Sequence, residues 1–540
     1  MPFVLAGRPG VPADTGAAAA QMGGQRRAGW LRTPAGGVTA LILVTLALRL
    51  VFASALGLGM DESYMVAAGR HLHLSYFDHP PLAWWMAWAA AHLLGTDAPW
   101  AVRLPFVVTF ALSTWLMFRL TERLFGAHAG LWAAALMNAS PVFGVTAASW
   151  VLPDGPLLAA LLGAALCLAR ALDAHDDAAA WRWWAGTGLC AGLALLAKYS
   201  AAFVIAGALL YLVTTGRGRA WLRRPMPWLA GLLAVAAFLP VLVWNARHHW
   251  ASFAFQGGRA AGTHLRLAGP LTSLAGEALF VLPWIWLPLM ICALAALRRG
   301  PAEPRGWLLV CLGLPTVALF TVVSLWTRVL FHWAAPGYLM LFPLLGLLVA
   351  RVWRDSRPVR VLLAATALLV STGVLVVASE VHYNWLPLVL GHFGPDRNPD
   401  LDAVDWTSVR ADLARRGLLN RPGLVVAATR WFDAGKLDYA LGGTPPVICL
   451  GNDPREYGLT APLADYAGAD ALIAAPRMTL DQVATMYGDM FDWIEPLPPV
   501  ELRHAGRPAM SIPLFLGHRL HTAAAFSDRG NDSGTRPPPA

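Results

Sequence analysis

Long apolar segments alternate with short polar ones through most of the chain. A helix needs about 20 apolar residues to cross a bilayer, and segments near that length follow one another here with few charges inside them. They lie at 37–58, 101–120, 127–147, 154–172, 183–197, 199–215, 228–246, 271–297, 306–326, 333–352 and 360–379. The pattern predicts a polytopic α-helical membrane protein with about eleven transmembrane helices over residues 34–380.

The pattern changes after residue 380, where Asp and Pro become frequent and the apolar runs shorten. Runs at 423–428, 446–450, 471–475 and 509–513 have the length and composition of β-strands separated by helices or loops. Residues 381–524 are therefore predicted to form a soluble α/β domain. Residues 1–33 and 525–540, rich in Gly, Ala, Pro and Arg, are predicted to be disordered tails.

The arginines predict the orientation of the helices. They gather on alternate loops, which the positive-inside rule places in the cytoplasm. The opposite loops, which hold the acidic pair Asp61 and Glu62, then face the periplasm. An odd number of spans with a cytoplasmic start puts the 381–524 domain on that same side. The cytoplasmic groups are Arg119 with Arg123, Arg170 with Arg182, 217–224, 298–305 and 351–360.

The composition agrees with a membrane protein: 57% of residues are hydrophobic, 14% are charged, and the mean hydropathy is +0.52. The net charge of +9 comes mostly from arginine. Membrane topology explains these arginines better than nucleic-acid binding does. The five cysteines have no CxxC spacing and four lie in apolar runs, so neither disulfides nor zinc-thiolate sites are expected.

Ionisable residues at the edge of a bilayer are costly unless they are used. Asp61 and Glu62 follow the first span directly, and Tyr76-Phe-Asp-His-Pro-Pro-Leu82 follows them. Lys198 interrupts an apolar stretch too long for one helix, so two helices joined by a tight turn are predicted there. An anionic lipid phosphate would satisfy Lys198, although the side chain could also snorkel to the interface.

These segments, with Arg103-Leu-Pro105, Pro153-Asp-Gly-Pro-Leu157 and Leu193-Ala-Leu-Leu-Ala-Lys-Tyr199, resemble the family 39-like membrane glycosyltransferases. That group has the GT-C fold and includes protein O-mannosyltransferases and the aminoarabinose transferase of lipid A. The resemblance covers residues 40–260 and weakly the rest. It implies transfer of a sugar from a polyprenyl-phosphate carrier to an acceptor on the outer face, by inverting direct displacement.

The resemblance implies that Asp61 is the catalytic base and that a basic residue at Lys198 meets the donor phosphate. Glu62 would orient Asp61 or the acceptor. The alternative is that Asp61 and Glu62 only open a surface helix, whose positive N-terminus favours acids. Further candidates for binding substrate or phosphate are Tyr64, Asp78, His79, Arg247, Arg259 and Arg328, because guanidinium groups clamp phosphate oxygens.

The remaining candidates have structural and functional interpretations. Pro80 and Pro81 are predicted to force an extended approach to a helix beginning at Leu82. Asp154 would either cap the fourth span or shape an acceptor or metal site. Asp78 and His79 replace a Glu-Lys pair of the aminoarabinose transferase. A histidine in place of the lysine weakens the case for a fixed positive charge at this position. Carboxylate and imidazole groups could instead hold a divalent metal ion, the candidate ligands being Asp78, His79, His248 and His249.

The sequence thus predicts an enzyme of the bacterial inner membrane whose partners are a polyprenyl-phosphate sugar, an envelope acceptor and the bilayer. No cofactor is required by the pattern, apart from the metal ion considered above. The alternative function is a transporter or lipid flippase, against which stands the lack of an internal repeat between halves. The sequence leaves open the sugar and the acceptor, which could be lipid A or core oligosaccharide, another glycan, a glycolipid or a protein.

Overall fold

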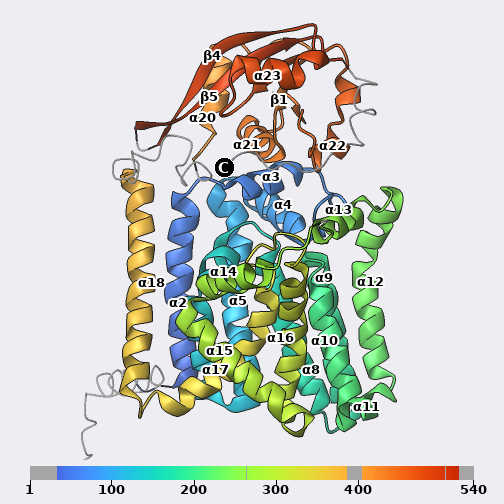
Figure 1. Ribbon diagram of the computed structural model, residues 1–540, viewed down its shortest axis with the longest axis vertical. Helices are drawn as coiled ribbons and strands as arrows, with labels where there is room; N and C mark the ends of the chain where they lie inside the picture. Colours follow the sequence, from blue (N-terminus) through green and yellow to red (C-terminus); the bar gives the residue numbers. More distant parts are fainter. Residues whose placement is uncertain (1–28, 30–32, 263, 386–403, 505, 522–540) are drawn as a thin grey trace, which may run out of the picture.

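The computed structural model describes the whole chain except residues 1–28, 30–32, 263, 386–403, 505 and 522–540. The two predicted disordered tails fall almost entirely outside the described residues. A bundle of long helices occupies one end of the molecule, and a smaller α/β domain sits on the other (Figure 1). The predicted division into a membrane domain and a C-terminal domain therefore has a structural counterpart.

Eight helices among the described residues are long and apolar enough to cross a membrane, or up to ten if each of two bent helix pairs is one span. The bent pairs are α6 (Ala127–Ala139) with η1 (Val142–Thr146) and α7 (Ala147–Ser149), and α10 (Ala201–Thr214) with α11 (Gly216–Leu222). The eight are α2 (Pro34–Ala55), α5 (Pro99–Phe125), α8 (Asp154–Leu172), α12 (Met226–Arg247), α15 (Pro283–Arg299), α16 (Pro304–Val323), α17 (Ala335–Val352) and α18 (Arg357–Tyr383).

Two differences separate these helices from the eleven predicted spans. The run 271–297 is broken at Leu282, whose φ of 81° lies outside the helical region, and Pro283 begins the next helix. The result is a short α14 (Gly269–Val281) followed by α15. The second difference is α9 (Asp177–Ala197), which has 21 residues but carries Asp177, Arg182 and three tryptophans in its first half. Those residues lower its mean hydropathy.

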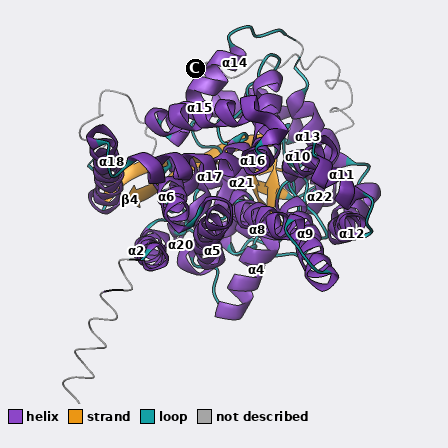
Figure 2. Cartoon of the chain, turned by 90° about the horizontal axis from the view of Figure 1, so that it is seen from below, coloured by secondary structure: helices purple, strands orange, loops and turns teal. Residues whose placement is uncertain are grey.

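The predicted break near Lys198 is confirmed. Helix α9 ends at Ala197, Lys198 is extended with φ −158° and ψ 139°, and α10 begins at Ala201. Helices α8 and α9 form a tight antiparallel hairpin. Their close packing is evident at Gly163, where a Cβ would lie 3.1 Å from Cys190 Sγ. Seen from below, α8 lies inside the bundle while α2, α12 and α18 lie at its periphery (Figure 2).

Three short helices cover the end of the bundle that faces the C-terminal domain (Figure 1): α3 (Met60–Ala68), α4 (Leu82–Leu94) and α13 (Ala251–Ala260). The predicted helix start at Leu82 is confirmed, with buried Pro81 as the residue that precedes its first turn. Helices α3 and α13 were not predicted as elements in their own right. They are too short for a membrane signal, yet they carry Asp61 and Arg259 respectively.

The C-terminal domain contains one sheet, with strand order β2-β1-β3-β5-β4. Strands β1 (Leu424–Ala428), β2 (Val447–Cys449) and β3 (Asp470–Ala474) are parallel, and β4 (Trp493–His504) and β5 (Arg507–His518) form an antiparallel hairpin beside β3. Its helices among the described residues are α20 (Ser408–Arg415), α21 (Trp431–Leu441), α22 (Tyr457–Thr460) and α23 (Leu480–Tyr487), with 3₁₀ turns at Leu463–Tyr466 and Gly488–Met490. A further 3₁₀ turn, Gly300–Ala302, joins α15 to α16 in the helical bundle.

Each of the four predicted strands overlaps a strand of this sheet, whereas β4 was missed. Pro496, Pro498 and Pro499 within β4 argue against a central strand, because proline cannot donate to the ladder. The structure resolves the conflict by placing β4 at the edge of the sheet.

Helix α21 joins the C-terminal domain to the membrane domain by packing on α3. A Cβ at Gly435 would lie only 2.6 Å from Tyr64 Cα, so the two helix backbones are in close contact. The buried Lys436 ammonium donates to the carbonyl of Leu58 at 2.5 Å and to that of Val404 at 3.0 Å. The loop that leads from α2 into α3 is therefore fixed directly against the domain.

Candidate functional site

Glu62 anchors the first turn of α3. It is 2% exposed, accepts from Arg103 at 2.8 and 2.5 Å, and also accepts from the backbone N–H groups of Gly59 and Val151, both at 2.9 Å. Burial alone would raise the pKa of Glu62, but the charge and hydrogen bonds of Arg103 outweigh it and hold that pKa below its ordinary value. Glu62 therefore anchors α3, and its role in orienting Asp61 or the acceptor stays a prediction.

Asp61, one residue earlier, is exposed in the first turn of α3. Successive helical residues point about 100° apart, so the inward anchoring of Glu62 turns Asp61 outward. The negative charge of Asp61 acts on Arg259 of α13, as do those of Asp78 and Asp453. Burial lowers the pKa of Arg259 below its ordinary value, an effect that Arg455 reinforces and these three carboxylates oppose. Asp61 and Arg259 thus belong to one electrostatic cluster.

Lys198 and Asp154 form a second pair, at the C-terminal end of α9 and the N-terminal end of α8. The Lys198 ammonium lies 3.0 Å from each carboxylate oxygen of Asp154, and the two side chains are 12% and 10% exposed. A nearly buried pair of this kind is stable only if both partners stay together or another ion replaces one of them. Asp154 is the first residue of α8, but the N-cap is Pro153 and no side chain caps the helix.

Two imidazoles face this pair. Burial and the positive charges of Lys198 and Arg259 lower the pKa of His79 well below 6.5, and the same causes lower that of His332 to about 4. Both rings are therefore neutral at physiological pH. His79 Nδ1 is buried and has no hydrogen-bond partner among the described residues. His332 was not a candidate from sequence, since an isolated histidine between two spans gives no signal.

Asp78 and Tyr64 lie where the C-terminal domain meets the membrane domain. The Tyr64 hydroxyl donates to Asp78 at 3.3 Å, and Arg455 of the C-terminal domain donates to the other Asp78 oxygen at 3.0 Å. Burial raises the pKa of Asp78 although Arg455 opposes the change. The Arg455 guanidinium also lies 3.5 Å from the centre of the Trp431 ring, in a cation–π contact.

Glu456 adds a second contact from the same loop. It is 1% exposed, accepts from the Phe77 N–H at 2.7 Å, and its own backbone N–H donates to the Tyr64 hydroxyl at 3.2 Å. Burial raises the pKa of Glu456 to about 8. Sequence reasoning missed both Arg455 and Glu456. The only signal was a polar Asp453-Pro-Arg-Glu456 segment after a strand.

Some predicted ligands stand apart from this cluster. Arg247 and Arg328 are exposed, and neither forms an ion pair within the described part of the chain. His248 stacks on Trp244 with 4.1 Å between ring centres, and His249 is exposed. Among the described residues no group of three or more His, Cys, Asp or Glu side chains could hold a metal ion. The four predicted metal ligands therefore do not form a site.

The overall architecture matches that of a solved protein structure. The structure of ArnT from Cupriavidus metallidurans in the apo state aligns with a TM-score of 0.56 at 16% identity, over 89% of this chain and 98% of that one. The same protein bound to undecaprenyl phosphate aligns with a TM-score of 0.56 at 15% identity. This chain has the GT-C fold. The predicted fold class, a helical membrane domain followed by a C-terminal domain, is confirmed.

Two comparisons of sequence agree with the fold. The family model for dolichyl-phosphate-mannose-protein mannosyltransferase matches residues 78–244, which include His79, Asp154 and Lys198. The lipid A galacturonosyltransferase RgtD of Rhizobium johnstonii is 25% identical over 291 residues, which are 52% of this GT-C chain and 58% of that protein. The chain thus spans less than two thirds of that relative. The resemblance to family 39-like membrane glycosyltransferases is confirmed.

Proposed function

We propose that this multi-pass membrane protein is a glycosyltransferase, which moves a sugar from a polyprenyl-phosphate carrier to an envelope acceptor on the periplasmic side of the inner membrane. Support comes from the fold shared with ArnT, which has been solved with undecaprenyl phosphate, and from the similarity to a lipid A galacturonosyltransferase. Lipid A is accordingly the first acceptor to test. The positive-inside arginines support the orientation.

The observation that carries the proposal is the convergence of one exposed carboxylate with several cations. Asp61 acts electrostatically on Arg259, and Arg259 in turn acts on His79 beside the Lys198–Asp154 pair. These groups come from α3, α8, α9 and α13, which all reach the same end of the bundle (Figure 1). A lipid-linked donor needs this arrangement, because its phosphate must meet cations while its sugar reaches a base.

The reaction that we propose is a single displacement. Asp61 accepts the proton of an acceptor hydroxyl as the oxygen attacks the anomeric carbon of the sugar. The bond from that carbon to the phosphate oxygen breaks at the same time, and the phosphate leaves on its lipid. Lys198 and Arg259 stabilise the negative charge that develops on the phosphate. Because attack and departure occur on opposite faces, the anomeric configuration inverts.

Lys198 must be shared between Asp154 and the donor in this scheme. The Lys198 ammonium donates to both carboxylate oxygens of Asp154, and it could donate to two phosphate oxygens in the same way. His79 and His332 are neutral there, so the fixed positive charge comes from Lys198 and Arg259. The bound phosphate would therefore meet two fixed cations and two neutral imidazoles.

The decisive experiment is a transfer assay with purified protein and radiolabelled undecaprenyl-phosphate sugars, using lipid A, a glycolipid and a peptide as separate acceptors. We expect Asp61→Asn to remain folded and to lose at least about 100-fold in rate, the usual range for a general base. Asp465→Asn, which removes an exposed charge from the C-terminal domain, should retain wild-type activity. Folded wild type that consumes no donor would favour a transporter.

A further inference from the structure

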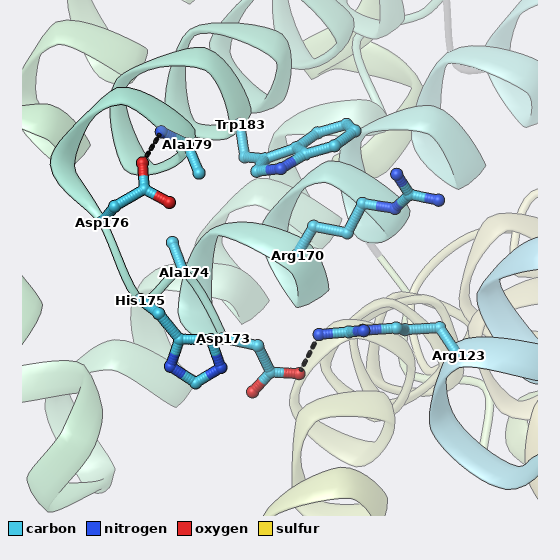
Figure 3. Close-up of a pocket in the computed structure, with 8 residues that line it drawn as sticks. All are labelled: Arg123, Arg170, Asp173, Ala174, His175, Asp176, Ala179 and Trp183. Atoms are coloured by element: carbon cyan, nitrogen blue, oxygen red, sulfur yellow. Dashed lines mark hydrogen bonds and ion pairs between the residues drawn. The ribbon is translucent and has the colours of Figure 1, made fainter.

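A hollow of about 210 Å³ lies at the opposite end of the α8–α9 hairpin from Asp154 and Lys198. It is bounded by the end of α8, the connecting loop and the start of α9, with Arg123 of α5 entering from the side (Figure 3). We call it the Arg170 pocket and define it by Arg123, Arg170, Asp173, Asp176 and Trp183. Nothing in the proposed reaction uses it.

Two guanidinium groups lie against Trp183 without an acidic partner: Arg170, which lines the pocket, and Arg182, which lies next to Trp183 in the sequence of α9. Arg170 lies 4.4 Å and Arg182 5.1 Å from the centre of the Trp183 ring. Neither forms an ion pair with a carboxylate in the parts of the chain that the structure describes. An arginine stacked on a tryptophan keeps its N–H groups free in the plane of the guanidinium, where they can donate to an anion.

The acids near the pocket are already engaged. Asp173 is shared between Arg123 and Arg217, each at 2.9 Å. Asp176 accepts the N–H of Ala179 at 2.7 Å and so caps α9. Arg170 meanwhile experiences the charges of Arg119, Arg123 and Arg182. Like charges gathered around one hollow repel each other, and an anion bound between them removes that cost.

The depth of the pocket indicates where the anion comes from. Helix α8 has 19 residues, so it rises about 28 Å from Asp154 to the pocket, close to the thickness of the hydrocarbon core. The pocket is therefore level with the headgroups of the leaflet opposite the reaction site. Tryptophan is enriched at that level, and basic pockets between membrane helices bind lipid headgroups there.

We propose that the Arg170 pocket binds the phosphate of a glycerophospholipid in the leaflet opposite the reaction site, with Arg170 and Arg123 as donors and Trp183 as its wall. The binding does not depend on the proposed function. Its consequence does, because α8 and α9 carry Asp154 and Lys198 at their other ends. A lipid bound at the α8–α9 loop would therefore also stabilise the positions of Asp154 and Lys198 at the other ends of the two helices.

The test is native mass spectrometry of the detergent-purified full chain titrated with phosphatidylglycerol, phosphatidylethanolamine or a galactosyl diacylglycerol that lacks phosphate. We expect both phospholipids to bind and the phosphate-free lipid not to. The double variant Arg170→Gln/Arg123→Gln, which removes both proposed donors, should weaken phospholipid binding by about tenfold or more, as expected for the loss of a charge-assisted hydrogen bond. The matched control is Arg298→Gln/Arg299→Gln, two exposed arginines at the end of α15.

Three results would overturn the proposal. They are equal weakening in the control, equal binding of the phosphate-free lipid, and displacement of the phospholipid by millimolar inorganic phosphate, which would indicate a site for a soluble anion. If the double variant fails to fold, Arg170→Lys serves instead. It keeps the charge but loses the planar stacked fork, and we expect weaker binding than in wild type. Wild-type binding by a folded Arg170→Lys would count against the proposal.

Discussion

Arg103 donates to both carboxylate oxygens of Glu62, at 2.8 and 2.5 Å, and thereby ties the first turn of α3 to α5. Both side chains are 3% exposed. The same guanidinium also donates to the carbonyls of Ala53, Leu56 and Gly57 at the end of α2. One arginine therefore sets the position of the loop that turns Asp61 outward.

Breaking this pair should cost both stability and activity. Glu62→Gln leaves Arg103 buried without a counter-ion, and the loss of one partner of a buried pair costs about 3–5 kcal/mol. We expect a lower thermal midpoint of the detergent-solubilised protein and slower transfer, because the α3 turn that holds Asp61 loosens. Asp61→Asn should in contrast slow transfer with no change in the midpoint. Equal midpoints for Glu62→Gln and wild type would contradict the anchoring role.

Lys198 should control affinity for the carrier. Lys198→Met removes a cation from the proposed phosphate site, so we expect undecaprenyl phosphate to bind about 10- to 100-fold more weakly, measured by native mass spectrometry. Pairing it with Asp154→Asn avoids a buried unpaired carboxylate and keeps the protein folded. Arg328→Gln, which removes an exposed arginine outside the cluster, is the control. Unchanged carrier affinity in Lys198→Met/Asp154→Asn would exclude Lys198 from the phosphate site.

Close contact at Gly435 should make docking of the C-terminal domain sensitive to a single methyl group. A Cβ there would meet the Tyr64 backbone at 2.6 Å, so Gly435→Ala must push α21 away from α3. We expect faster proteolysis within residues 404–521 and weaker transfer. Gly488→Ala is the matched control, because a Cβ at Gly488 would meet nothing within 4 Å. Equal proteolysis rates for the two variants would show that the α21–α3 contact does not limit docking.

The sequence predicts features that depend on local pattern. Apolar runs locate most helices, the break at Lys198 is visible as one charge in an apolar stretch, and four of the five strands follow from short apolar runs. The break at Leu282 was missed, although Pro283 offered a signal, because the apolar run continues through it. Hydrophobicity alone does not report where a helix bends.

The site is harder to predict because it is assembled from distant parts of the chain. Nothing in the adjacent residues Asp61 and Glu62 tells which one points inward; that is decided by Arg103, 41 residues later. Arg455 reaches Asp78 from 377 positions away. The family resemblance is strong only over 40–260, and none of its motifs includes Arg455. Only the folded chain brings the C-terminal domain to the loop beside the proposed base.

Glu456 should make docking of the C-terminal domain depend on pH. Burial raises the pKa of Glu456 to about 8 in the docked domain, from an ordinary value near 4.5. Asp78, which also faces it, adds to that rise through its negative charge. The docked state thus retains a proton over this range that an undocked state would release. Docking is strongest below about pH 4.5 and weakens as pH rises toward 8, by about 1.4 kcal/mol per pH unit within that window.

Glu456→Gln should remove this dependence. The amide oxygen can still accept from the Phe77 N–H, whose distance to Glu456 Oε2 is 2.7 Å, but the amide does not ionise. We expect proteolysis of the wild-type domain to accelerate between pH 5 and pH 8 in detergent, with a flat response in Glu456→Gln. Asp465→Asn, at an exposed acid of the same domain, should keep the wild-type slope. A slope in Glu456→Gln as steep as in wild type would mean that another group controls docking, with Asp78 the next to replace because it lies beside Arg455.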